Sequence, residues 1–81
     1  MMKELIAKID EVQRLYHESD RLDEAGNEAE ADKAYAEAYR LNEEVAKEIS
    51  EFTRGQVDVE AASYMAWQQP EMVKSILSKA K

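Results

Sequence analysis

The stretch that decides the fold reads EADKAYA (30–36), EAYRLNE (37–43), EVAKEIS (44–50) and EFTRGQV (51–57). Each of these four heptads opens with Glu, follows it with an apolar residue, and carries Lys or Arg three positions after the Glu. Residues three apart are neighbours only on the surface of an α-helix, where an acid–base pair contributes about 0.2–0.5 kcal/mol. The stretch therefore predicts one long helix. Three earlier heptads, in residues 4–24, open with Glu in the same frame and predict a second helix.

Glycine marks the expected end of each long helix. The first helix is expected from about residue 3 to 25, because Gly26 and Asn27 both tolerate the left-handed conformation that ends helices. The second is expected from about residue 28 to 54, with Gly55 as its stop. Two long helices joined by two residues must run antiparallel.

Both helices carry apolar residues at helical spacing, interrupted in the first helix by Ser19. Pairing outward from the turn predicts four contacts: Leu22 with Ala31, Leu15 with Ala38, Ile9 with Val45, and Met2 or Leu5 with Ile49 and Phe52. Small residues then lie nearest the turn and large ones at the open end. Large side chains spread the helices there and make room for a third element.

Residues 58–80 are expected to be that element, a helical cap over the open end. Asp58 suits a helix N-cap, and Pro70 suits the first position of a last helix. Because the residue before proline is pushed out of helical geometry, the cap is either one kinked helix or two short ones. The predicted fold class is all-α: a long antiparallel helical hairpin with one or two short C-terminal helices, forming a small helical bundle. An 81-residue chain allows a single helical domain, 1–81.

Composition restricts the class of partner. The chain holds 18 acidic and 11 basic residues, a net charge of −7, and the whole excess lies in residues 1–54. Phosphate backbones attract clustered Lys and Arg, so a nucleic-acid partner is disfavoured. The sequence has no cysteine, no apolar run of about 20 residues and no apolar N-terminal signal segment. We therefore expect a cytoplasmic protein with no membrane partner.

Residues 15–43 resemble a single tetratricopeptide motif. Large and small residues fall at the consensus positions of that family: Leu15, Ser19, Leu22, Gly26, Ala31, Tyr35, Ala38 and Leu41. Glu18, Glu28 and Glu43 depart from it, where the family prefers Leu, an aromatic residue and Pro. The second helix also continues about three turns past the family's usual stop. The resemblance implies a helical hairpin that binds peptides or helices of other proteins, and no individual binding residue carries over.

No residue pattern indicates catalysis, a cofactor or a metal. His17 is the only histidine and has no cysteine or second histidine to complete a ligand set. Glu48 falls at an interior heptad position, and we interpret it as the point where the apolar stripe moves to the next position and the side chain reaches water. There is no Gly-rich phosphate loop and no nucleophile–base pair. We expect a protein that is not an enzyme and uses no cofactor.

The sequence has more large apolar side chains than two packed helices can bury between them, and this excess predicts a contact surface. Tyr, Trp and Met are enriched at the centres of interfaces, and the candidate partner-binding residues are Tyr39, Phe52, Tyr64, Met65, Trp67 and Met72. Packing of the tail on the hairpin explains the same residues equally well. The expected function is that of a non-catalytic protein–protein interaction module, either a small acidic adaptor or a self-associating homodimer.

Two alternatives stay open. An acidic inhibitor, or nucleic-acid mimic, would present the acidic face of residues 4–51 to the basic nucleic-acid-binding site of a partner protein. A more remote alternative is a helix-turn-helix-like DNA binder, in which Pro70 opens a recognition helix carrying Lys74, Lys79 and Lys81. Salt separates a charge mimic from an apolar interface, because salt screens exposed charges.

Overall fold

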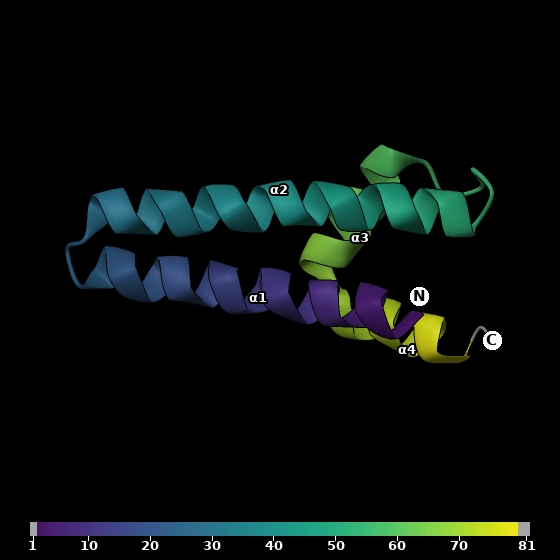
Figure 1. Cartoon of the computed structure of the whole chain (residues 1–81), viewed down its shortest axis with the longest axis horizontal. Coiled ribbons are helices and arrows are strands. Elements are labelled where there is room, and N and C mark those ends of the chain that lie inside the picture. Colours follow the sequence, from purple (N-terminus) through teal and green to yellow (C-terminus); the bar gives the residue numbers. More distant parts are fainter. Residues whose placement is uncertain (1, 80–81) are drawn as a thin grey trace.

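Residues 2–79, without the side chain of Met2, are described in the computed structural model, and they form four helices and no strand. The helices are α1 (Met2–Glu24), α2 (Glu28–Phe52), α3 (Val59–Gln68) and α4 (Pro70–Lys79). Figure 1 shows α1 and α2 side by side as an antiparallel hairpin, with α3 crossing α2 and α4 lying against α1. The predicted all-α hairpin with a helical cap is confirmed. The predicted end of the cap at residue 80 lies outside the described residues.

Gly26 ends α1 as its conformational freedom predicts. Its φ is 84°, in the left-handed region, and its N–H donates to the carbonyl of Asp23 at 3.1 Å. The N–H of Asn27 donates to the carbonyl of Leu22 at 2.9 Å. These two bonds form the Schellman arrangement that satisfies the last carbonyls of a helix. The helix accordingly ends at Glu24, one residue before the predicted end.

The end of α2 differs from the prediction in one respect. The helix ends at Phe52 and not at Arg54, because Arg54 itself adopts the left-handed conformation, with φ of 56°. The Arg54 N–H bonds to the carbonyl of Glu51, and the Gly55 N–H bonds to the carbonyl of Ser50 at 2.8 Å. The Schellman position is therefore taken by Arg54, one residue before the glycine to which the sequence pattern pointed.

Two separate helices form the cap, which decides between the two arrangements that the sequence allowed. Asp58 is the N-cap of α3, and its Oδ1 accepts a hydrogen bond from the Ala61 N–H at 2.8 Å. Gln69 leaves helical geometry, with φ of −134° and ψ of 59°, as expected for a residue before proline. Pro70 then begins α4.

All four helices contribute to one core near the open end of the hairpin. Its buried residues are Leu5, Ile9 and Val12 from α1, Ala38, Val45, Ala46 and Ile49 from α2, Ala62 and Ala66 from α3, and Val73 and Leu77 from α4. Leu15, which was predicted to contact Ala38, and Leu41 are half-buried against this core. Phe52, at the end of α2, is 44% exposed and lies outside this buried core.

The part of the hairpin nearest the turn projects beyond α3 and α4 (Figure 1). We call residues 18–33 the arm and the other described residues the base. In the arm only Ser19 and Ala31 are buried. The hydroxyl of Ser19, which interrupts the apolar stripe, donates to the carbonyl of Ala31 at 3.0 Å and links the two helices there.

Candidate functional site

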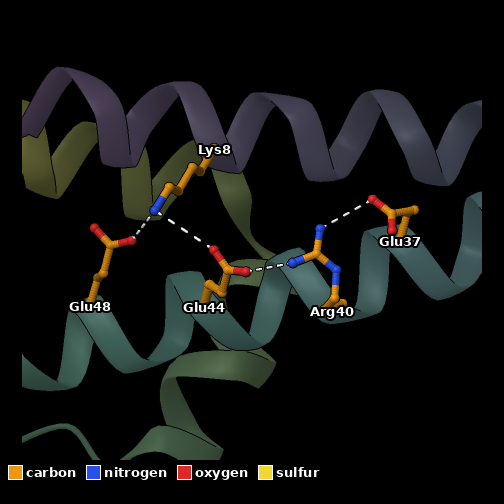
Figure 2. A network of polar contacts seen from close by, with 5 residues as sticks. All are labelled: Lys8, Glu37, Arg40, Glu44 and Glu48. Carbon is orange, nitrogen blue, oxygen red and sulfur yellow. Dashed lines mark hydrogen bonds and ion pairs between the residues drawn. The ribbon is translucent and has the colours of Figure 1, made fainter.

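A network of charges covers one flank of α2 (Figure 2). Lys8 of α1 donates a hydrogen bond to Glu48 and lies 3.9 Å from Glu44. The Arg40 guanidinium lies 2.6 Å from the carboxylate of Glu44 and 3.2 Å from that of Glu37, so it links the two. The hydrogen bond to Glu48 raises the pKa of the Lys8 ammonium, and the charges of Glu48 and Glu44 add to this against a partial loss of hydration. Glu48 is thus half-exposed and ion-paired.

Of the four acid–base pairs, three residues apart, that the heptads predicted along α2, only two form in the described structure. Glu37 pairs with Arg40, and Glu30 lies 3.9 Å from Lys33. Glu44 turns to Arg40 and to α1 instead, while Arg54 has left the helix. These pairs are exposed, so each contributes little to stability.

An open groove lies between α2 and α3. On α2 it is on the flank opposite the charge network, across the stripe of residues that faces α1. The volume of the groove is about 590 Å³. It is lined by Tyr35, Tyr39, Asn42 and Glu43 of α2 and by Val59, Glu60, Ser63, Tyr64, Trp67 and Gln68 of α3. On each helix these residues recur every three or four positions, so each helix presents one face to the groove.

Four aromatic side chains wall the groove. The ring of Trp67 lies 5.9 Å from that of Tyr35 and 5.1 Å from that of Tyr16, both edge-to-face. Tyr16 belongs to α1, so Trp67 is held by rings from both helices of the hairpin. Tyr39 and Tyr64 are 56% and 67% exposed, and neither packs on another described ring. The groove therefore combines a fixed aromatic wall with two solvent-exposed tyrosines.

Asn42 lies at the floor of the groove and is only 3% exposed. Its Nδ2 donates to the Ser63 carbonyl at 3.1 Å and to the Ser63 hydroxyl at 3.2 Å, which ties α2 to α3. Its Oδ1 is buried and accepts no hydrogen bond from the described residues. Sequence reasoning missed this residue. The available signal was an Asn four positions after Ala38 and three before Val45, on the buried face of a helix.

Among the described residues, the charges that line the groove are all negative. Glu43 lines it from α2 and Glu60 from α3, whereas no Lys or Arg of residues 2–79 does. Neither carboxylate forms an ion pair within the described residues. This differs from the network of Figure 2, in which every carboxylate has a cationic partner.

The structure brings three of the six predicted contact residues together in the groove, namely Tyr39, Tyr64 and Trp67. Tyr35, Val59 and Asn42 join them without having been predicted. Met65 is half-buried against the core. Phe52 and Met72 are 44% and 42% exposed, but they lie at the end of α2 and on α4, outside the groove.

His17 is exposed, with its ring 6.0 Å from that of Tyr16. Among residues 2–79, no group of three or more His, Asp or Glu side chains is placed to hold a metal ion. Within the same residues, no helix has both the length and the apolar character needed to cross a bilayer. Comparison with protein-family models, with curated proteins and with solved structures finds no match to this chain.

Proposed function

We propose that this protein is a non-catalytic interaction module that binds a partner protein through the groove between α2 and α3. The observation that carries the proposal is the exposure of Tyr39 and Tyr64 beside Trp67 on one concave surface. Aromatic side chains bury about 150–250 Å² each and dominate interface energetics. A partner that covers these rings therefore gains more than it would on any polar face of the molecule.

The walls of the groove are built on two packed helices, which favours binding. Every lining residue lies on a helix, and Trp67 is held by Tyr16 and Tyr35. The bonds from Asn42 to Ser63 fix α3 against α2 at the floor. A site already in its binding conformation loses little side-chain or loop freedom when a partner docks. The tetratricopeptide-like hairpin is consistent with this use, since that family binds segments of other proteins.

Affinity purification with groove variants tests the proposal. Tyr39→Ala and Tyr64→Ala remove exposed rings from the groove, while Phe52→Ala removes a similarly exposed ring outside it. The parent and Phe52→Ala should retain the same partner protein. Either tyrosine variant should lose it, because truncation at such a position costs about 2 kcal/mol or more. Identical partners for all four proteins would refute the groove as the binding site. Circular dichroism of each variant shows that the fold is intact.

A second copy of the chain is a further candidate partner. Met72 and Ile76, 42% and 52% exposed, lie one turn apart on α4 and leave an apolar stripe open to solvent. This stripe favours a homodimer, the commonest closed assembly. Sedimentation equilibrium at micromolar concentration should give twice the 9.3 kDa chain mass for the parent, and 9.3 kDa for Ile76→Glu. A 9.3 kDa parent would remove the dimer from consideration.

The arm supports the alternative of an acidic inhibitor that mimics nucleic acid. Residues 18–33 hold seven of the 18 acidic residues and two of the 11 basic ones. Binding through the arm would weaken steeply between about 0.1 and 1 M salt, as the Debye length falls from about 10 to 3 Å, whereas binding through aromatic rings would persist. The DNA-binding alternative gains no support from Lys74, which pairs with Asp10 and with Glu71.

A further inference from the structure

We propose that the groove recognises an arginine side chain of its partner, placed over the aromatic wall and neutralised by Glu43 and Glu60. This inference rests on the proposed function and names the chemistry of the partner. Three features of the groove carry it: its rings, its unpaired carboxylates and its polar floor.

The rings select a flat cation. Tyr39, Tyr64 and Trp67 present π faces or edges to a cavity of about 590 Å³, which lies within the range of sites that enclose a ligand group. A cation within about 6 Å of an aromatic centre is attracted by the ring quadrupole, by about 0.5–2 kcal/mol. The guanidinium of arginine is planar, weakly hydrated and stacks on such rings, whereas the ammonium of lysine is compact and strongly hydrated.

The carboxylates supply the complementary charge. Glu43 and Glu60 come from different helices, both line the groove, and neither forms an ion pair within the described residues. Since no Lys or Arg of residues 2–79 lines the groove, an arriving guanidinium meets only attractive charges from these residues. The net charge of −7 also favours the approach of a basic segment. An acidic or strongly apolar segment would leave the two carboxylates uncompensated.

The floor offers a hydrogen-bond acceptor. The Ser63 hydroxyl lines the groove, whereas Asn42 Oδ1 is closed to solvent although it accepts no bond from the described residues. A guanidinium carries five N–H donors and no acceptor, so it can donate to this hydroxyl as well as to the two carboxylates. The rings, carboxylates and hydroxyl together suit arginine better than any neutral side chain.

A pair of small probes tests this chemistry without knowledge of the partner. N-acetylarginine amide carries the guanidinium, and N-acetylcitrulline amide is its neutral analogue of nearly the same shape. Trp67 is the only tryptophan, so its indole N–H gives one assignable signal from the groove in a ¹H–¹⁵N spectrum. At constant ionic strength, the arginine probe should shift this signal with a Kd at least about tenfold lower than the citrulline probe.

Two charge-matched double variants supply the control. Glu43→Gln with Glu60→Gln removes the groove carboxylates, and Glu24→Gln with Glu28→Gln removes the same charge from the arm. The groove pair should abolish the preference for the arginine probe, and the arm pair should leave it unchanged. Backbone amide signals away from residues 35–43 and 59–68 report that both variants remain folded.

Equal shifts from the two probes, no shift with the arginine probe, or equal losses in the two double variants would overturn the inference. The proposed function is separately decided by the Tyr39→Ala and Tyr64→Ala purification. If those variants lose a partner while the probes show no preference, the groove binds protein but does not select arginine.

Discussion

The arm and the base are made from the same two helices, yet only the base has α3 and α4 to bury apolar side chains against (Figure 1). In the base, the eleven buried apolar side chains of the core come from all four helices. In the arm, the buried residues are Ser19 and Ala31, one of them polar. The comparison indicates that the heptad pattern is enough to define a hairpin, while stability and a shaped surface require the cap.

Charge separates the two regions as well. Residues 18–33 carry seven acids and two bases, so most of the net charge of −7 lies in the arm. The base holds the cross-linked network of Lys8, Arg40 and their three glutamates (Figure 2). Like charges repel across the arm, and no large core opposes this repulsion. We expect the arm to open locally at a lower free-energy cost than the base.

The largest expected effect on stability comes from truncating one apolar side chain of the base, compared with the same truncation in the arm. Ile9→Ala empties a position that is 1% exposed in the core and should lower the free energy of unfolding by about 2–5 kcal/mol. Leu22→Ala truncates a half-buried side chain of the arm and should cost much less. Urea unfolding followed by circular dichroism measures both. An equal loss for the two variants would show that the arm is packed as firmly as the base.

A smaller loss is expected from overfilling the helix crossing. Ala38 is fully buried, so Ala38→Leu should destabilise the protein by about 1–3 kcal/mol. Ala36→Leu makes the same change on the exposed side of α2 and should fall within about 0.5 kcal/mol of the parent. If Ala38→Leu melts no lower than Ala36→Leu in a thermal scan, the register of the hairpin is different.

The helix ends show which parts of this fold the sequence could predict. Gly26, Asp58 and Pro70 act through their own backbone or side-chain chemistry, and each was placed correctly. Arg54 adopts a left-handed conformation that local preference favours for Gly55, so the end of α2 was misplaced by two residues. That choice depends on the path of residues 53–58 toward α3, which is tertiary information.

The candidate site was predictable only in part for the same reason. Tyr39, Tyr64 and Trp67 were identified because they exceed the needs of a two-helix seam, but the sequence does not state which flank of α2 will receive α3. Once α3 crosses there, Tyr35 and Asn42 become part of the groove. Asn42 lies in an apolar stripe, where a polar residue has meaning only when its partner, Ser63, is in place.

Within the arm, Ser19→Ala removes the hydrogen bond to the Ala31 carbonyl. The expected loss is about 0.5–1.5 kcal/mol, the usual net value of one such bond. Because this bond links the two helices beyond the base, amide hydrogen exchange should speed up in residues 18–33 and stay unchanged around Val45. Uniform acceleration along the chain would mean that arm and base open together.

The smallest effect concerns pH and the network of the base. The pKa of Lys8 is raised above its ordinary value chiefly by its hydrogen bond to Glu48. This stabilisation is therefore fully present below about pH 10.4 and is lost as pH rises through the folded-state value. Lys8→Gln should lie below the parent in stability at neutral pH and converge with it in strong alkali. A gap that persists after Lys8 is deprotonated would point to lost packing of the lysine stem.

Site-resolved photo-crosslinking in the native cell tests the central claim most directly. The crosslinking residue p-benzoylphenylalanine replaces Tyr64 in the groove, Asp23 in the arm or Ile76 on α4, three positions that are all exposed. We predict a discrete adduct with a second protein from position 64, and none of comparable yield from position 23. An adduct from position 23 alone would contradict the groove and favour the acidic mimic. An adduct from position 76 alone, at twice the chain mass, would contradict it in favour of a homodimer.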